Sequence, residues 1–334
     1  IRDRIKDAAA RANNKLKLLP TNKQRAISKA AKEVWQNKHG KQFPIDVFQT
    51  GSGTSTNMNA NEVIANLASK YSKLDINPND DVNMSQSSND VIPTAMHCAY
   101  YVDTAEKLMP AMDLLIDTIA KKIAQYHGVV KTGRTHLMDA MPLTIDQELG
   151  AWNTQLLNAR ASLITVLDAL RFLPQGGTAV GTGINAHPRF AREFCKAISP
   201  LVGFKAETSN DYFRNLSSQD LSVQLSGELK NLAVILMKIS NDLRWMNSGP
   251  LAGIAEVELQ ALQPGSSIMP GKVNPVIPEA VAMAGADVIG NDVTVTVAAQ
   301  SGSFQLNVMM PVIAYCNLKS VNICLLYTSD AADE

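Results

Sequence analysis

The chain has 334 residues, of which 46% are apolar and 19% are charged, a composition typical of folded globular proteins and unlike that of disordered chains. Lysine plus arginine and aspartate plus glutamate both number 31, so no overall charge attracts nucleic acid or an anionic membrane. An anionic ligand therefore has to be bound by local cations and hydrogen-bond donors.

The cysteines and the chain ends indicate a cytoplasmic protein that is cut at its N-terminus. The four cysteines are scattered along the chain without CxxC spacing, which disfavours a disulfide framework or a zinc site. No uninterrupted apolar run of about 18 residues is present, and the first residues, IRDRIKDAAARANNK, are too charged for a signal peptide. Because the sequence starts in a helical pattern without methionine, we expect the true N-terminus to be missing.

Three long helices are predicted by apolar residues that recur every three or four positions. They cover residues 105–125, 152–170 and 219–246, and the third would be about 40 Å long. Its apolar residues extend beyond one stripe, which indicates packing against partner chains. Helices of this length favour an all-α fold, built as an elongated long-helix bundle. The best strand-like run, DVTVTVAAQ at residues 292–300, is equally compatible with a helix.

Five polar segments rich in glycine or hydroxyl groups lie between the helical patterns, and several of them are predicted to be loops by their glycine and proline content. They are QTGSGTSTNMNANE (residues 49–62), NPNDDVNMSQSSND (77–90), KTGRTHLMDAMP (131–142), GGTAVGTGIN (176–185) and PGSSIMPGKVNP (264–275). Segments so far apart can form one site only if the long helices bring their ends together. None has the complete pattern of a nucleotide-binding loop, whereas many backbone N–H groups and hydroxyls suit a carboxylate.

Three groups in these segments are candidates for chemistry, and each also has a purely structural interpretation. His136, beside Arg134, is either a structural histidine or an acid–base group near neutral pH. The run SQSSND (residues 85–90) is a helix N-cap that can also be an anion site. Lys272 and Asn274 are either a solvated pair or donors that stabilise an oxyanion. The residues alone predict a site for a small acid with more than one carboxylate, without metal or nucleotide, and leave the reaction open.

Together the segments resemble those of a known enzyme superfamily. GSSIMPGKVNP resembles the signature loop of the fumarase/aspartase superfamily, and QTGSGTSTNMNANEV, SQSSNDVIPTAMH, KTGRTHLMDAMPLT, GGTAVGTGIN and SGPLAGI resemble blocks of class II fumarate hydratases in the same order. The resemblance extends to about Val321. It implies a homotetramer with a twenty-helix core and active sites built from three subunits each. It also implies the reversible trans addition of water to fumarate, giving (S)-malate in the tricarboxylic acid cycle, without a metal or organic cofactor.

The resemblance also assigns roles to individual residues. Ser266 resembles the catalytic base that takes a proton from C3 of malate, supported by Lys272 and Asn274. A free serine hydroxyl is too weak a base for this step, so its pKa has to be lowered by its surroundings. His136 resembles the histidine that handles the water, with Glu279 as its charge partner. The implied substrate ligands are Ser52, Gly53, Thr54, Ser87, Ser88, Asn89, Thr135, Ser267, Lys272, Val273 and Asn274.

Further implications concern the loop and a second site. The signature loop would be a mobile flap that closes over the dicarboxylate, with Gly265 and Gly271 as hinges. A secondary dicarboxylate site is implied at Asn77, Pro78, Asn79 and Asp80. Many family members have a histidine at the position of Asn77, which places that second site in question, and several have arginine where this chain has Leu251.

Two other functions stay open at this point. Aspartate ammonia-lyase, of the same superfamily, adds ammonia to the same alkene; QTGSGT and MPGK favour the hydratase, whereas NPNDDVN, NPVIPE and NDVTVTVAAQSG also resemble the ammonia-lyase. A catalytically silent helical scaffold is the third reading, and the intact catalytic positions argue against it.

The same resemblance predicts the domain organisation. Residues 1–90 would be the remainder of the N-terminal lyase domain, and residues 91–323 the central helical bundle domain that carries the signature loop. We expect a C-terminal domain to be missing. Independently of that resemblance, residues 324–334, CLLYTSDAADE, resemble a translated transposon-type sequencing adaptor and are predicted to be a non-native tail.

Overall fold

The computed structural model describes residues 1–263 and 265–333, with side chains up to residue 329. Pro264, the first residue of the predicted signature loop, and Glu334, the last of the predicted tail, lie outside the described residues. The chain forms two compact units. Unit 1 comprises Ile1–Val102, Val166–Gln224 and Val293–Leu318, and unit 2 comprises Asp103–Thr165, Leu225–Asp292 and the chain from Lys319 on.

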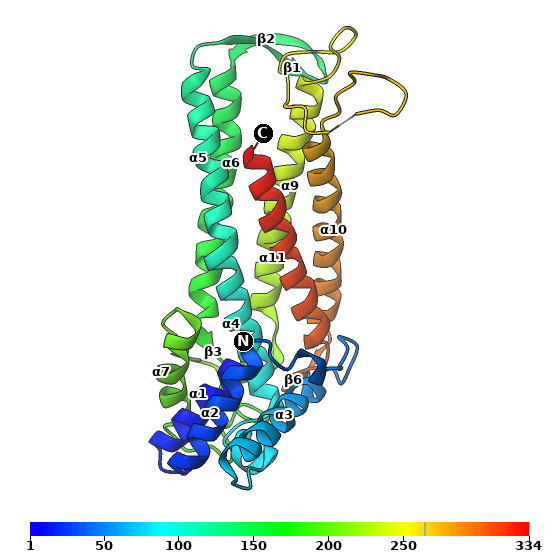
Figure 1. Cartoon of the computed structure of the whole chain (residues 1–334). Coiled ribbons are helices and arrows are strands. Elements are labelled where there is room, and N and C mark those ends of the chain that lie inside the picture. Colours follow the sequence, from blue (N-terminus) through cyan, green and yellow to red (C-terminus); the bar gives the residue numbers. More distant parts are fainter. Residues whose placement is uncertain (264, 334) are drawn as a thin grey trace. The chain divides into compact units, whose positions relative to one another are not determined.

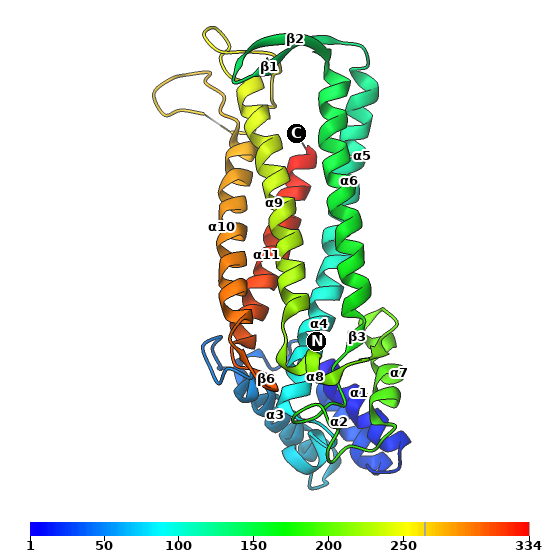
Figure 2. The same cartoon turned by 180° about the vertical axis from the view of Figure 1, so that it is seen from behind.

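The fold is mainly helical, as the sequence predicts (Figures 1 and 2). The helices are α1 (Arg2–Lys15), α2 (Thr21–Trp35), α3 (Thr54–Ser72), α4 (Ser88–Asp103), α5 (Met109–Gln125), α6 (Ile145–Leu170), α7 (Phe190–Val202), α8 (Tyr212–Ser217), α9 (Asp220–Met246), α10 (Val276–Ala299) and α11 (Met310–Asp333). Short helical turns are η1 (Gly40–Gln42), η2 (Pro78–Val82) and η3 (Thr104–Leu108). Two-stranded sheets pair β1 (Val130–Thr135) with β2 (Met138–Thr144), β3 (Phe172–Leu173) with β4 (Glu207–Thr208), and β5 (Gly302–Ser303) with β6 (Leu306–Asn307).

Unit 1 is organised around α1, whose alanines allow neighbours to pack closely on two sides. Ala8 lies in one buried cluster with Phe194 of α7. Ala10 lies in a second buried cluster with Ile27 of α2 and Ile64 of α3. Because α1 is covered on both sides, a polar side chain that points inward from it needs partners inside the unit.

Unit 2 contains long helical segments that run side by side, with the β1–β2 hairpin at one end (Figures 1 and 2). The apolar stripes predicted from the sequence are the buried faces of these helices: Met112 of α5, Leu156 of α6 and Leu229 of α9 are all fully buried. Packing of such faces against one another supplies most of the stability of helices in proteins. The prediction of a long-helix bundle is confirmed.

The structure resolves one ambiguous run and adds an element that the sequence reading did not predict. Residues 292–300 belong mostly to α10, and Val295 and Ala298 are buried at helical spacing. The segment predicted as a polar loop at residues 131–142 is instead most of an antiparallel hairpin, β1–β2. Its strands are short and largely exposed, so the alternation of apolar residues that marks a half-buried strand is missing.

Two helices, α10 and α11, are long and apolar enough on average to cross a membrane, by length and composition only. Neither helix contains an uninterrupted apolar run of about 18 residues, because charged residues interrupt both. In α10, Asp292 is buried and paired with Lys230 of α9. Core helices of globular bundles have the same average hydropathy.

The chain around Gly51 passes very close to the segment that precedes α11. A Cβ atom on Gly51 would lie 1.6 Å from the carbonyl oxygen of Val308, and the backbone N–H of Met310 donates to the Gly51 carbonyl over 3.1 Å. No side chain fits between the two backbones, so glycine is required here by the close approach.

We therefore expect Gly51→Ala to lower the free energy of unfolding by about 2 kcal/mol or more, because one backbone segment has to move away from the other. Gly150→Ala in α6 is the matched control, since its Cβ position meets no described atom within 4 Å apart from the neighbouring backbone of its own helix, and alanine is the better helix former there. Urea unfolding followed by circular dichroism measures both variants. Equal stability of the two variants would contradict the close approach.

Candidate active site

Three of the predicted polar segments meet in unit 1, at the N-terminal end of α4. The first contributes the start of α3, where Gly53 has a φ of 73° and forms the N-cap. The hydroxyls of Ser52 and Thr54 lie 2.7 Å apart, and the Cα of Gly53 packs so close to Ile92 of α4 that a Cβ would lie 2.9 Å from its side chain. The N-terminal ends of α3 and α4 are therefore held together.

A hydrogen bond joins the first and second segments directly. Asn57, one turn after Thr54 in α3, donates from Nδ2 to the Oγ of Ser88 over 2.9 Å. The side chain of Asn57 is fully buried, whereas Ser88 is partly exposed. Since helix N-termini present free backbone N–H groups, hydroxyls gathered here add to an anion-binding environment.

Asp90 joins the third segment to the same place. One of its carboxylate oxygens accepts from the N–H of Ser87 over 2.9 Å, and the other accepts from the N–H groups of Gly176 and Thr178, both over 3.0 Å. Asn89 donates from Nδ2 to the carbonyl of Ala179 over 2.8 Å. The loop at residues 176–185 is thus fixed to the start of α4, and three of the five polar segments lie together in unit 1.

Asp90 is fully buried, and burial raises the pKa of its carboxyl group to about 6, although three backbone N–H groups oppose this shift by stabilising the charged form. In the sequence this aspartate belongs to the run SQSSND, which predicts a helix N-cap that can also be an anion site. Its second role, binding a loop that lies more than 80 residues further along the chain, has no local sequence signal.

The predicted secondary site lies at η2. The side-chain oxygen of Asn77 accepts from the N–H groups of Asn79 and Asp80 over 2.8 and 3.0 Å, so it caps this turn. Lys23 of α2 forms a salt bridge of 2.7 Å with Asp81. Whether this exposed turn binds a dicarboxylate stays a prediction.

In unit 2, His136 lies at the tip of the β1–β2 hairpin. His136 and Leu137 form a two-residue turn, and both have positive φ, 55° and 62°, as in the turns that match the twist of two-stranded hairpins. Positive φ is unfavourable for residues with a Cβ atom and is often retained at functional positions. The imidazole is exposed, as an acid–base group needs to be in order to meet a ligand.

The hairpin is held to the chain that follows α9 by ion pairs. Glu256 pairs with Lys131 over 2.9 Å and with Arg134 over 3.1 Å, and Lys131 also pairs with Glu148 of α6. Lys131 and Glu256 are largely buried, where the attraction between opposite charges is stronger than at exposed sites. This network fixes β1 just before Thr135 and His136, and Glu256 was not among the predicted site residues.

The two ends of the signature loop, here called its neck, are held together, and the hydroxyl of Ser266 accepts hydrogen bonds from two backbone N–H groups. The Oγ of Ser266 accepts from the backbone N–H groups of Ile268 and Met269 over 3.2 and 3.1 Å. The neck is closed by Asn274, whose Nδ2 donates to the Gly265 carbonyl over 2.6 Å. N–H groups directed at a hydroxyl stabilise its deprotonated form, which is the effect that a serine base requires.

The two glycines of the loop differ in what requires them. Gly271 has a φ of 79°, which favours glycine. A Cβ on Gly265 would lie 2.2 Å from the Lys272 carbonyl, so glycine is required there by close packing of the neck. Their predicted role as hinges stays a prediction.

Several predicted site residues are not connected within this chain. Among the described residues, no hydrogen bond or ion pair links His136 with Glu279, which lies partly buried in the first turn of α10. Ser267, Lys272 and Val273 are exposed on the signature loop. Their predicted roles in binding stay predictions.

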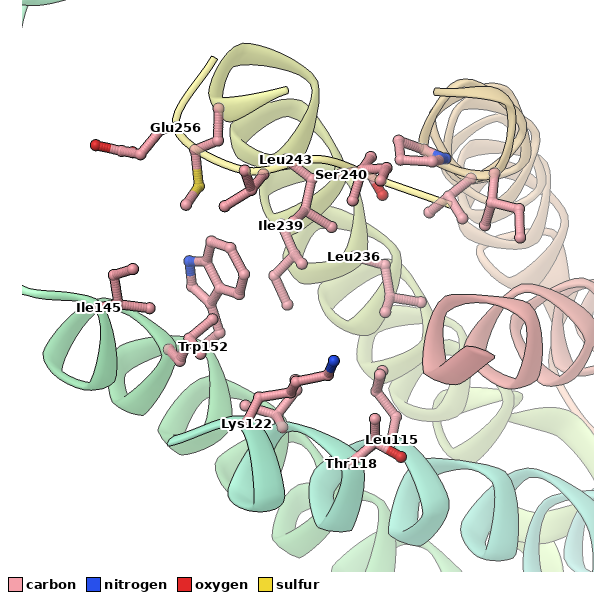
Figure 3. A pocket seen from close by; sticks show the side chains of 18 of the residues that line it. Leu115, Thr118, Lys122, Ile145, Trp152, Leu236, Ile239, Ser240, Leu243 and Glu256 are labelled. Carbon is pink, nitrogen blue, oxygen red and sulfur yellow. The ribbon is translucent and has the colours of Figure 1, made fainter. Parts of the chain in front are cut away.

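Unit 2 also contains a pocket of about 280 Å³ between α5, α6, α9 and the start of α10 (Figure 3). Trp152, Leu236 and Ile239 line it, together with Lys122 and other mostly apolar side chains. No predicted site residue is among its lining. Because a dicarboxylate needs several donors or cations around each charged group, this apolar pocket does not suit the predicted substrate.

Comparison with known proteins defines the class first. Residues 2–290 match the sequence profile of a family described as lyase. The chain is 55% identical to fumarate hydratase class II 2 of Pseudomonas aeruginosa, over 95% of this chain and 69% of that protein. It is 56% identical to fumarate hydratase class II of Xylella fastidiosa, over 96% of this chain and 67% of that protein.

The three-dimensional structure agrees with these matches. It superposes on the crystal structure of recombinant class II fumarase from Schistosoma mansoni with a TM-score of 0.97 and 38% sequence identity, covering 99% of this chain and 74% of that one. The chain therefore belongs to the lyase family, and within it to the class II fumarate hydratases.

The burial of Asp90 predicts that it makes the stability of the folded protein depend on pH, an effect that the Asp90→Asn variant lacks. Its pKa in the folded protein, about 6, lies above the ordinary value of 3.8, so the folded state holds this proton more tightly than the unfolded state. The contribution of Asp90 to stability is therefore largest below about pH 4 and falls as the pH rises to about 6, by up to roughly 3 kcal/mol.

Urea unfolding of the protein and of Asp90→Asn at several pH values between 4 and 6.5 measures this. We expect the free energy of unfolding of the parent, minus that of the variant, to decrease as the pH rises. A constant difference would show that the three N–H donors balance the cost of burial, and an increase with pH would show that they outweigh it; either result would contradict the raised pKa.

Proposed function

We propose that the protein catalyses the reversible addition of water to fumarate, giving (S)-malate. The observation that carries this proposal is the convergence of three polar segments at the N-terminal end of α4, where Asp90 and Asn57 fix donors around the partly exposed Ser87, Ser88 and Asn89. Such a donor-rich helix end suits a carboxylate. The relatives are named class II fumarate hydratases, and fumarate is a ligand with such carboxylate groups.

In the proposed mechanism, Ser266 removes the proton from C3 of malate and returns it in the opposite direction. The N–H groups of Ile268 and Met269 stabilise its alkoxide, and Lys272 and Asn274 stabilise the negative charge that develops on the adjacent carboxylate. His136 is the acid–base group for the water: it protonates the hydroxyl group that leaves C2, and in the reverse direction it accepts a proton from the water that adds to C2. Glu279 supports the charged imidazole, in an active site completed by other copies of the chain.

We further propose a cytoplasmic homotetramer that acts in the tricarboxylic acid cycle. Exposed apolar side chains on α10 support the assembly: Met283, Val293 and Val297 have 70%, 59% and 54% of their surface exposed in the single chain, and a second copy that covers them would remove this area from water. The proposed chemistry uses serine and histidine and needs no metal. Within the described residues, no cluster of three or more His, Cys, Asp and Glu side chains gathers to hold one.

The test of function is an absorbance assay of the conjugated double bond of fumarate. We expect the absorbance to fall in plain buffer and malate to form, with no loss of rate after dialysis against a chelator. Loss of absorbance only when ammonium is added would identify an ammonia-lyase instead. An inactive protein that still forms tetramers would support a silent scaffold.

Two substitutions test the catalytic roles. We expect Ser266→Ala to lower kcat at least ~1,000-fold and His136→Asn at least ~100-fold, because each removes a proton-transfer group. His127→Asn is the control for the histidine. Its side chain is 83% exposed and pairs with Asp146 of α6, and it precedes the first residue of β1, whereas His136 follows the last. Ser301→Ala is the control for the serine, since its hydroxyl donates to the Val297 carbonyl in the preceding helical turn. Activity above a tenth of the parent in Ser266→Ala would refute the assigned base.

A further inference from the structure

A fully buried lysine on α1 lies at the centre of the polar cluster behind Ser88. The Nζ of Lys6 donates to Asn83 Oδ1 over 2.9 Å and to Gln86 Oε1 over 3.1 Å, and none of its surface is exposed. It is 82 residues away from Ser88 in the sequence and has no direct contact with it. Burying a lysine is costly unless its donors are satisfied, so its position calls for an explanation.

The oxygen of Asn83 is the shared acceptor of this cluster. It accepts from Lys6, from Asn57 Nδ2 over 3.3 Å and from Asn61 Nδ2 over 3.2 Å. An ammonium group has donors only, so the atom of Asn83 that faces Lys6 has to be its oxygen. Asn57 and Asn61 face the same atom and therefore have to present their NH₂ groups to it.

This fixed orientation has a cost that is visible in the structure. The side-chain oxygens of Asn57 and Asn61 are buried and have no hydrogen-bond partner among the described residues. An amide that its neighbours did not constrain would rotate until its oxygen accepted a hydrogen bond, because an unsatisfied buried acceptor is unfavourable. The two amides are held the other way by the acceptor that they share with Lys6.

The orientation of Asn57 determines what Ser88 can do. Because Asn57 Nδ2 donates to Ser88 Oγ, the serine oxygen is an acceptor in that bond, and its proton is left to be donated elsewhere. We propose that Lys6 is a positioning residue that, through Asn83 and Asn57, keeps the hydroxyl of Ser88 as a donor to a substrate carboxylate. This inference rests on the proposed function and adds a residue that does not contact the substrate.

The reversed orientation shows what Lys6 prevents. Without a donor at this place, Asn83 can give up the long 3.3 Å bond from its Nδ2 to the Gln86 carbonyl and turn its NH₂ group towards Asn57. Asn57 can then present its oxygen to Ser88. The serine proton would pair with Asn57 and be lost to the ligand. The expected loss is that of one hydrogen bond to a charged group, which corresponds to roughly a tenfold weaker binding of the dicarboxylate.

The test is a double-mutant cycle between Lys6→Met and Ser88→Ala, with KM and kcat measured for fumarate. Burial lowers the pKa of Lys6 to about 7, so the assays are run at pH 6.5, where the ammonium form prevails. We expect Lys6→Met to raise KM about tenfold with kcat changed less than about threefold, and to have little further effect when Ser88 is already alanine. Lys15→Met, at the exposed end of the same helix, is the control and keeps both constants.

A second pair of variants covers the case in which Lys6→Met fails to fold. Asn83→Asp retains an acceptor for Lys6, Asn57 and Asn61, and we expect it to keep KM within about threefold of the parent. Asn83→Leu removes the acceptor, and we expect it to raise KM about tenfold.

Each outcome decides the inference. Equal effects of Lys6→Met with and without the Ser88 hydroxyl, or equal effects of Asn83→Asp and Asn83→Leu, would show that the cluster only stabilises the fold and would overturn it. A parent protein that does not hydrate fumarate would instead contradict the proposed function, and the inference with it.

Discussion

The arrangement of the candidate site depends on one buried carboxylate. Asp90 accepts N–H groups from its own helix start and from the loop at residues 176–178, so two segments that are far apart in sequence share one fixed geometry. Burial raises its pKa, which means that the carboxylate is retained at a cost in stability. A polar group kept at such a cost is expected where it specifies an arrangement that apolar packing does not, and here the arrangement is a set of hydroxyls at a helix N-terminus.

The chemistry of a dicarboxylate makes the direction of each hydrogen bond as important as its length. A carboxylate only accepts, so each group around it has to donate. Serine and threonine hydroxyls can do either, and neighbouring groups decide which. In unit 1 that decision traces back to one donor-only group: Lys6 fixes the orientation of the Asn83 amide, Asn83 accepts from Asn57, and Asn57 donates to Ser88. In unit 2 the same principle holds at Ser266, which receives two N–H groups and is thereby prepared to lose its proton.

The fold was largely predictable because long helices carry their signal locally. The stripes through Met112, Leu156 and Leu229 correctly marked the buried faces. The β1–β2 hairpin was missed, since its exposed strands have no apolar alternation and its turn, His136 and Leu137, lacks the usual glycine or asparagine. The domain boundaries predicted from the resemblance stay a prediction, as does the non-native tail, through which α11 continues to Asp333.

The site was predictable in its segments and not in its connections. The polar blocks could be identified from their composition, and three of them do converge. Lys6 lies in an alanine-rich helix and Glu256 in an unremarkable stretch, so nothing local marks either as a partner of the site. Contacts of this kind depend on which buried donors and acceptors the tertiary structure brings within about 3 Å of each other, and a single sequence does not contain that information in any one segment.

The most direct measurement is a crystal structure of the protein with a saturated four-carbon dicarboxylate, which resembles the substrate and does not react. We predict that one carboxylate lies at the N-terminal end of α4, within hydrogen-bond distance of Ser88 Oγ and Asn89, with Asn57 donating to the same serine. A ligand bound elsewhere, or a carboxylate that makes no contact with residues 87–89, would contradict the account.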